Sequence, residues 1–154
     1  MDAIIGRSPI VNADVLIRLL KREDTKELKQ KLRSYLTEPL NAFLSESCII
    51  TDQILNEVTV EAKHHGISRE SIITTLYPPY SSYFHIVYVD SECIKRSVDS
   101  IKEYPDYDLS LSEWSTIWFM SKNNCTTLIS GNSDFDRVFS NAQLQSQFAS
   151  IKRV

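Results

Sequence analysis

Short apolar runs alternate along the chain with segments in which apolar residues recur at helical spacing. The runs are short enough for buried strands and cover 8–11, 48–50, 83–89 and 126–130, the last being the final core strand. Helical spacing covers 15–20, 24–44 with a break at Pro39, 51–66, 68–76, 91–104 and 112–123. Strands that alternate with helices in this way predict a central parallel sheet between two layers of helices, a three-layer α/β/α sandwich.

Local signals mark where several of these helices begin and end. Thr51 is a favourable N-cap residue and Gly66 a favourable helix end. The histidines at 64–65 lie just before that end, where the helix dipole favours positive groups, and we interpret them in that way rather than as ligands. Ser110 and Glu113 have the spacing of a capping box, which marks the start of the helix before the last strand.

Apolar residues at helical spacing also indicate which helix faces point inward. In 91–104 these residues are Ile94, Val98 and Ile101. In 112–123, Trp114 and Trp118 lie one helical turn apart, and we assign them to the core or to an interface between subunits.

Composition restricts the chain to one ordinary globular domain. It has 154 residues, of which 42% are apolar and 24% charged, so a single domain over 1–154 is expected. The 17 basic and 20 acidic side chains leave a formal charge of −3, and a polyanion would therefore need a local basic patch or a metal. The three cysteines lack paired spacing, which predicts buried, reduced thiols. No signal peptide or membrane span is evident, which predicts a cytoplasmic protein.

Polar residues gather at the ends of the predicted strands, where open parallel sheets bind ligands. Two follow the first strand, one lies on the helix after the second, one opens the helix before the last strand, and two follow that strand. In chain order they are Asn12, Asp14, Glu57, Glu113, Asn132 and Asp134.

Each of these residues also has an ordinary structural explanation. Asp14 is a favourable N-cap residue, and Glu113 belongs to the capping box. Asn132 and Asp134 are common turn residues. Glu57 has the weakest such explanation, because its apolar neighbours on the helix place it near the buried side, where an unpaired carboxylate is costly.

The order of these residues resembles that in the PIN domain nucleases, in particular the VapC type of toxin ribonuclease. Four motifs carry the resemblance over nearly the whole chain. Residues 10–20 fit an Asp-Thr-Asn-like triplet followed by an apolar helix, and 51–58 fits a helix that carries a glutamate. Residues 107–113 are similar to a Leu-Ser-Leu-Thr-Asp-like helix start, with Glu113 in place of the usual Asp. Residues 130–136 are similar to Thr-x-Asp-x-Asp-Phe.

The resemblance implies a divalent-metal-dependent endoribonuclease that hydrolyses single-stranded or structured RNA. The residues at its catalytic positions are Asn12, Glu57, Glu113 and Asn132. The implied metal ligands are Asp14, Glu57, Glu113 and Asp134. The metal is Mg²⁺ or Mn²⁺, because hard cations prefer oxygen ligands and activate water near neutral pH. The resemblance further implies a homodimer and an antitoxin protein that neutralises the toxin.

Two positions depart from the family pattern. Asn12 and Asn132 stand where the family has aspartates, so neutral amides replace two anionic ligands and metal affinity should fall. Three explanations are open: Asp14 and Asp134 substitute in part, the chain is a natural inactive relative, or the asparagines were introduced.

Two other classes of protein are alternatives. Asn12 favours a catalytically inactive PIN-like module that binds RNA or protein. A receiver-type phosphoacceptor domain also gathers acids at strand ends, but the sequence has no clear phosphoacceptor aspartate after a third strand and no matching lysine.

Overall fold

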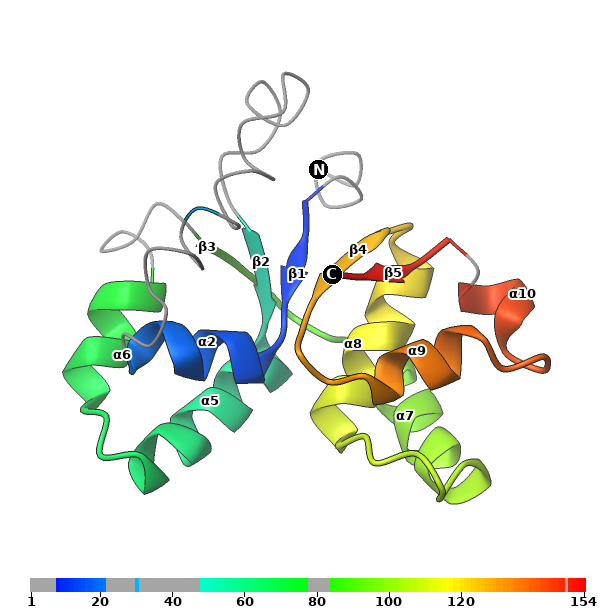
Figure 1. Cartoon of the computed structure of the whole chain (residues 1–154), viewed down its shortest axis with the longest axis horizontal. Helices are drawn as coiled ribbons and strands as arrows, with labels where there is room; N and C mark the ends of the chain where they lie inside the picture. Colours follow the sequence, from blue (N-terminus) through cyan, green and yellow to red (C-terminus); the bar gives the residue numbers. More distant parts are fainter. Residues whose placement is uncertain (1–7, 22–29, 31–47, 78–83, 149) are drawn as a thin grey trace.

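The computed structural model describes residues 8–21, 30, 48–77, 84–148 and 150–154. Within them, five parallel strands form one sheet in the order β3-β2-β1-β4-β5. The strands are β1 (Ile10–Val11), β2 (Cys48–Thr51), β3 (Phe84–Val87), β4 (Thr127–Ile129) and β5 (Lys152–Arg153). The sheet is the central layer of an α/β/α sandwich, as the alternation of apolar runs and helical segments predicts (Figure 1).

Helices connect the strands and flank the sheet. They are α2 (Ala13–Leu20), α5 (Asp52–His64), α6 (Arg69–Leu76), α7 (Ser91–Glu103), α8 (Leu111–Lys122), α9 (Asp134–Phe139) and α10 (Gln145–Phe148). In Figure 1, α2, α5 and α6 lie on one side of the strands and α7 to α10 on the other. Helix α5 packs against both α2 and α8, so the two groups meet below the sheet.

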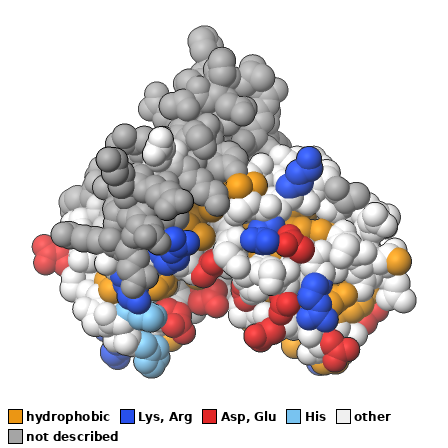
Figure 2. Space-filling model, viewed as in Figure 1, with side chains coloured by type: hydrophobic (Ala, Val, Ile, Leu, Met, Phe, Trp, Pro, Cys, Tyr) orange, Lys and Arg blue, Asp and Glu red, His pale blue; other side chains and the backbone are white. Residues whose placement is uncertain are grey.

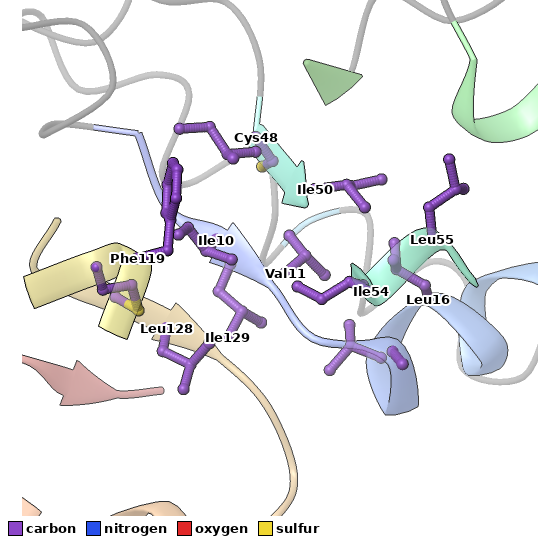
Figure 3. Packing of buried hydrophobic residues seen from close by; sticks show 14 of the residues in the cluster. Ile10, Val11, Leu16, Cys48, Ile50, Ile54, Leu55, Phe119, Leu128 and Ile129 are labelled. Carbon is purple, nitrogen blue, oxygen red and sulfur yellow. The ribbon is translucent and has the colours of Figure 1, made fainter. Parts of the chain in front are cut away.

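The core is built from the strands at the centre of the sheet. Ile10 and Val11 of β1 are fully buried, since β1 has neighbouring strands on both sides and helices on both faces. Figure 3 shows side chains of β1, β2 and β4 in one cluster with Leu16 of α2, Ile54 of α5 and Phe119 of α8. The short apolar runs of the sequence are therefore the buried strands they were predicted to be.

The local signals for helix ends are confirmed. Thr51 caps α5, and its Oγ1 accepts a hydrogen bond of 3.1 Å from the backbone N–H of Ile54. Ser110 and Glu113 form both hydrogen bonds of the capping box at the start of α8. Gly66 has a φ of 69°, the left-handed conformation that glycine adopts without strain where a helix ends.

The predicted inward face of α7 is wrong. The buried residues of this helix are Cys93, Ser97 and Ser100, whereas the predicted Val98 and Ile101 are each 38% exposed and Ile94 is half-buried. These small side chains let α7 pack closely against α8, whose side chains at the contact include large aromatic residues.

The two tryptophans of α8 lie in the core as predicted, one fully and one in part. Trp114 is fully buried. Trp118 is half-buried, and its Nε1–H donates to Ser100 Oγ at 2.9 Å. Ser100 lies on the buried face of α7 with Cys93 and Ser97, and not on the predicted face.

The run at 126–130 is a strand, but it is not the last one. Lys152 and Arg153 form β5 and pair in parallel with β4, and α9 and α10 lie between the two strands. The strand expected over 83–89 ends at Val87. The backbone N–H of Val89 donates to Asp52 Oδ1 at 2.9 Å, and Asp90 then caps α7.

Some predicted elements lie outside the described residues. The helical pair expected over 24–44 and residue 83 lie outside them. The three cysteines are described, are buried, and form no disulfide with one another. Among the described helices, none is both long enough and apolar enough to cross a membrane.

Candidate functional site

The strand order changes direction at β1, which has β2 on one side and β4 on the other. Ligands of open α/β sheets bind beyond the carboxyl ends of the strands at such a point. Asn12 follows β1 directly, and Asn132 lies in the loop after β4. Glu57 of α5 and Glu113 in the first turn of α8 approach the same place from the helices.

These residues line one cleft of about 440 Å³. The lining residues are Asn12, Ala13, Asp14, Ile17, Arg18, Glu57, Glu61, His65, Glu113 and Asn132. Figure 2 shows a notch in the surface between the part that holds α2 and α5 and the part that holds α8 and α9, with acidic side chains along its walls. The structure thus brings together five of the six residues that the sequence singles out at the strand ends.

Asn12 is the centre of the hydrogen-bond network at the floor of this cleft. Its side chain is buried, and Nδ2 lies 3.0 Å from Asp14 Oδ1, 3.1 Å from Glu113 Oε2 and 3.2 Å from Ser130 Oγ. The amide oxygen of Asn12, Oδ1, is buried and has no hydrogen-bond partner among the described residues. A buried amide oxygen without a partner is costly, so it marks a place where a ligand would be stabilising.

Glu113 is held by amides on both of its oxygens. Oε2 accepts from Asn12 Nδ2 and, at 3.0 Å, from Asn132 Nδ2. Oε1 accepts from the backbone N–H of Ser110 at 3.1 Å, which is one half of the capping box. Glu113 therefore belongs to the capping box and to the cleft at once, and the two asparagines stabilise its charge by hydrogen bonding where the family pattern has aspartates.

Asp14 joins the start of α2 to the loop after β4. Its Oδ1 accepts from Asn12 and from Ser130 Oγ at 3.1 Å, and its Oδ2 accepts from Gly131 N–H at 2.6 Å. The alternative explanation of Asp14 as the N-cap of the first helix is wrong, because Asn12 is at that position. The carboxylate fixes the loop that carries Asn132.

Glu57 is the second residue of the cleft that has a buried side-chain oxygen without a partner among the described residues. It is half-buried, and its Oε2 is buried without a hydrogen-bond partner among the described residues. Burial raises the pKa of Glu57, and the negative charge of Glu113 raises it further, while the hydroxyls of Ser112 and Ser110 act in the opposite direction. The expectation that this carboxylate lies near the buried side is confirmed.

Asp134 and Asp136 lie outside the lining of the cleft. The Asp134 carboxylate accepts from the backbone N–H of Asp108 at 3.0 Å and pairs with Arg137 at 3.3 Å. Asp136 pairs with Arg153 at 2.7 Å and so ties α9 to β5. Both carboxylates therefore bind neighbouring groups outside the cleft.

Three further residues of the cleft were not found from the sequence. Arg18 lies one turn after Asp14 on α2, and Glu61 and His65 follow Glu57 along α5. The spacing of 57, 61 and 65 places them on one face of α5, and that spacing is the signal that could have found them. His65 was not identified as a cleft residue because its position at the helix end already explained why a histidine is favourable there.

The fold of the chain is similar to that of a protein of known structure. No protein-family model and no curated protein matches the chain. Among solved structures, the chain is similar to VapC20 of Mycobacterium tuberculosis, described as a Sarcin-Ricin loop cleaving toxin. The TM-score is 0.64, the sequence identity is 13%, and the similarity covers 84% of this chain and 94% of that one. The fold is PIN-like.

The cleft of this PIN-like fold has oxygen donors that suit a hard cation held by few protein ligands. No three acidic, histidine or cysteine side chains among the described residues form a metal site by themselves. The unpartnered oxygens nevertheless belong to Asn12 and Glu57, two residues that line the same cleft as Glu113. Because Mg²⁺ commonly takes one or two carboxylates and keeps several waters, the donor chemistry of these three residues fits Mg²⁺ or Mn²⁺.

Proposed function

We propose that this chain is a divalent-metal-dependent endoribonuclease and the toxin of a toxin–antitoxin pair, with metal affinity lowered by Asn12 and Asn132. The observation that carries the proposal is the pair of buried, unpartnered oxygens, Asn12 Oδ1 and Glu57 Oε2, in one cleft with Glu113. The similarity in fold to a Sarcin-Ricin loop cleaving toxin supports RNA as the substrate.

Asn12, Glu57 and Glu113 would hold the cation in this proposal. When bound, Mg²⁺ or Mn²⁺ supplies a water activated near neutral pH and neutralises charge that develops on the phosphate. Glu57 and Glu113 supply the negative charge that attracts the ion, and the amide oxygen of Asn12 supplies a neutral ligand.

The other residues of the floor act as positioning residues. Asn132 orients Glu113 through its amide, and Asp14 holds the loop that carries Asn132 through Ser130 and Gly131. Asp134 has no direct part in the proposal, since its carboxylate is engaged outside the cleft.

A cleavage assay tests the proposal. The purified chain is incubated with a mixture of single-stranded RNAs in Mn²⁺ and, separately, in EDTA. Glu57→Gln should lower the cleavage rate by at least about 100-fold, because loss of groups that merely support a ligand already costs 10–100-fold. Glu70→Gln is the matched control, since it makes the same change on the exposed face of α6 outside the cleft.

The outcomes separate the two classes of function. Cleavage that needs metal and disappears in Glu57→Gln supports the nuclease. If the chain is inert but a variant with both Asn12→Asp and Asn132→Asp cleaves, the acidic site is real and the asparagines disable it. If neither protein cleaves any RNA offered, the proposal fails and a PIN-like binding module takes its place.

The remaining parts of the proposal concern partners and compartment. An antitoxin that covers or enters the acidic cleft would neutralise the toxin, and a homodimer in the cytoplasm is the expected form. Sedimentation of the purified chain, alone and with the protein that co-purifies from its native host, tests both expectations.

A further inference from the structure

The cleft extends well beyond its acidic floor along α5. Glu57, Glu61 and His65 lie at positions i, i+4 and i+8 of this region and all line the cleft. At a rise of 1.5 Å per residue, this row is about 12 Å long. The facing wall is α2, with Ile17 and Arg18 one turn beyond Ala13 and Asp14. The cleft is therefore a short groove whose outer end lies between Arg18 and His65.

The charge of the lining changes along this groove. The floor carries Glu57 and Glu113, whereas the outer part carries Arg18 and His65 together with one acidic residue, Glu61. His65 Nε2 lies 3.8 Å from Glu61 Oε2, so the imidazole and this carboxylate are neighbours at the outer end of the groove. Figure 2 shows basic and histidine side chains on the front surface of the part that holds α2 and α5, with acidic side chains between them and the notch.

The size and lining of the groove suit the backbone of one extended strand. Its volume of about 440 Å³ is near the small end of ligand pockets, which span roughly 300–1,000 Å³. No aromatic side chain is among the described residues that line it, so bases would find no surface for stacking. The apolar wall of Ala13 and Ile17 can face a sugar, and the donors of Arg18 and His65 can face a phosphate.

We propose that the outer end of the groove is a phosphate subsite for single-stranded RNA, formed by Arg18 and His65. This inference rests on the proposed function, since it concerns the phosphate next to the one at the acidic floor. The planar guanidinium of Arg18 binds phosphate oxygens with two hydrogen bonds, and the imidazole of His65 adds another donor. Both are positioning residues that place the strand across the floor.

Salt-dependent binding of RNA tests the subsite. A short fluorescein-labelled single-stranded RNA is titrated with the full chain in EDTA, and the anisotropy is measured at several salt concentrations. Arg18→Gln should weaken binding about tenfold, because a charged hydrogen bond is lost. It should also reduce the slope of log K against log[salt] by about 0.7, the value of one phosphate contact on a single strand.

Two further variants separate a phosphate contact from a structural effect. His65→Gln should also weaken binding, whereas His64→Gln should leave it unchanged, because His64 is adjacent and exposed but does not line the groove. Arg18→Lys should restore the salt slope and only part of the affinity, since lysine keeps the charge and loses the second hydrogen bond. In the cleavage assay, Arg18→Gln should raise KM and leave kcat unchanged.

Three results would overturn the inference. The first is that the wild-type chain does not bind the RNA. The second is that Arg18→Gln binds it with the same affinity and the same salt slope as the wild-type chain. The third is that His64→Gln and His65→Gln weaken binding equally. Failure of the proposed function looks different. A chain that binds RNA through Arg18 and His65 and never cleaves it refutes the hydrolysis alone, and cleavage with an unchanged salt slope in Arg18→Gln refutes the subsite alone.

Discussion

Replacing both Asn12 and Asn132 by aspartate should make the stability of the chain depend on a divalent cation. In the wild-type chain, each amide donates a hydrogen bond to Glu113 Oε2, at 3.1 and 3.0 Å. The amides thus stabilise the charge of Glu113 without a metal, and the amide of Asn12 also donates to Asp14 Oδ1 at 3.0 Å. In the double variant, the two new carboxylates would meet those of Asp14 and Glu113, and an ion would have to take over the role of the amides.

The magnitude follows from these contacts. Each hydrogen bond to a charged group contributes about 1.5–3 kcal/mol, and three are lost, two to Glu113 and one to Asp14. Two unit charges 3 Å apart would repel by about 5 kcal/mol at an effective dielectric constant near 20, which protonation of one carboxylate and the partial exposure of Asn132 and Glu113 reduce. Protonation of one carboxylate also restores one hydrogen-bond donor, so two bonds remain lost, and we expect a net loss of about 3–6 kcal/mol. This corresponds to a fall in Tm of roughly 6–24 °C for a domain of this size.

Thermal unfolding followed by circular dichroism measures this effect in EDTA and in Mn²⁺. The double variant should lose stability in EDTA and recover about 2.7 kcal/mol when Mn²⁺ reaches 100 times its Kd. Asn56→Asp is the control, because it adds the same charge on the exposed side of α5. The reasoning is refuted if the double variant melts at the wild-type temperature in EDTA, or if Mn²⁺ stabilises it no more than Asn56→Asp.

Three smaller perturbations test other parts of the structure. Burial and the charge of Glu113 raise the pKa of Glu57. The contribution of Glu57 to stability therefore falls as the pH rises from the usual glutamate pKa to the raised one. Glu57→Gln should raise Tm at about pH 8 and give no gain at about pH 4. Thr51→Ala should cost about 1 kcal/mol, seen in urea unfolding, because α5 loses its N-cap, and no change would mean that the cap contributes nothing. A Cβ on Gly131 would lie 3.0 Å from Asp14 Oδ2, so Gly131→Ala should push that carboxylate away, lower stability by about 1 kcal/mol and slow cleavage, and wild-type values of both would contradict the positioning role of the loop.

The parts of the fold that depend on neighbours in sequence were predictable. The cap at Thr51, the capping box of Ser110 and Glu113 and the buried run at β1 each require only a few adjacent residues. The predicted face of α7 failed because apolar spacing ignores small polar residues. Ser100 is buried there by its hydrogen bond to an indole eighteen positions away in sequence, which no local pattern contains.

The candidate site was predictable for a related reason. Residues that follow neighbouring strands in a parallel sheet must meet at one edge, so topology alone brings Asn12 and Asn132 together. Glu57 and Glu113 reach the same place from α5 and α8. The sequence could not reveal that Asp134 turns away to Arg137, or that β5 exists, since two polar residues paired with β4 have no periodicity to detect. His65 was missed because a simpler explanation was available at the helix end.

The decisive measurement is binding of Mn²⁺ to the wild-type chain and to Glu57→Gln, followed by electron paramagnetic resonance. We expect one weak site in the wild-type chain, none in Glu57→Gln, and one that is at least about tenfold tighter when Asn12 and Asn132 are both replaced by aspartate. Equal binding by the wild-type chain and Glu57→Gln, or no binding by the double aspartate variant, would contradict the claim that Asn12, Glu57 and Glu113 hold a divalent cation.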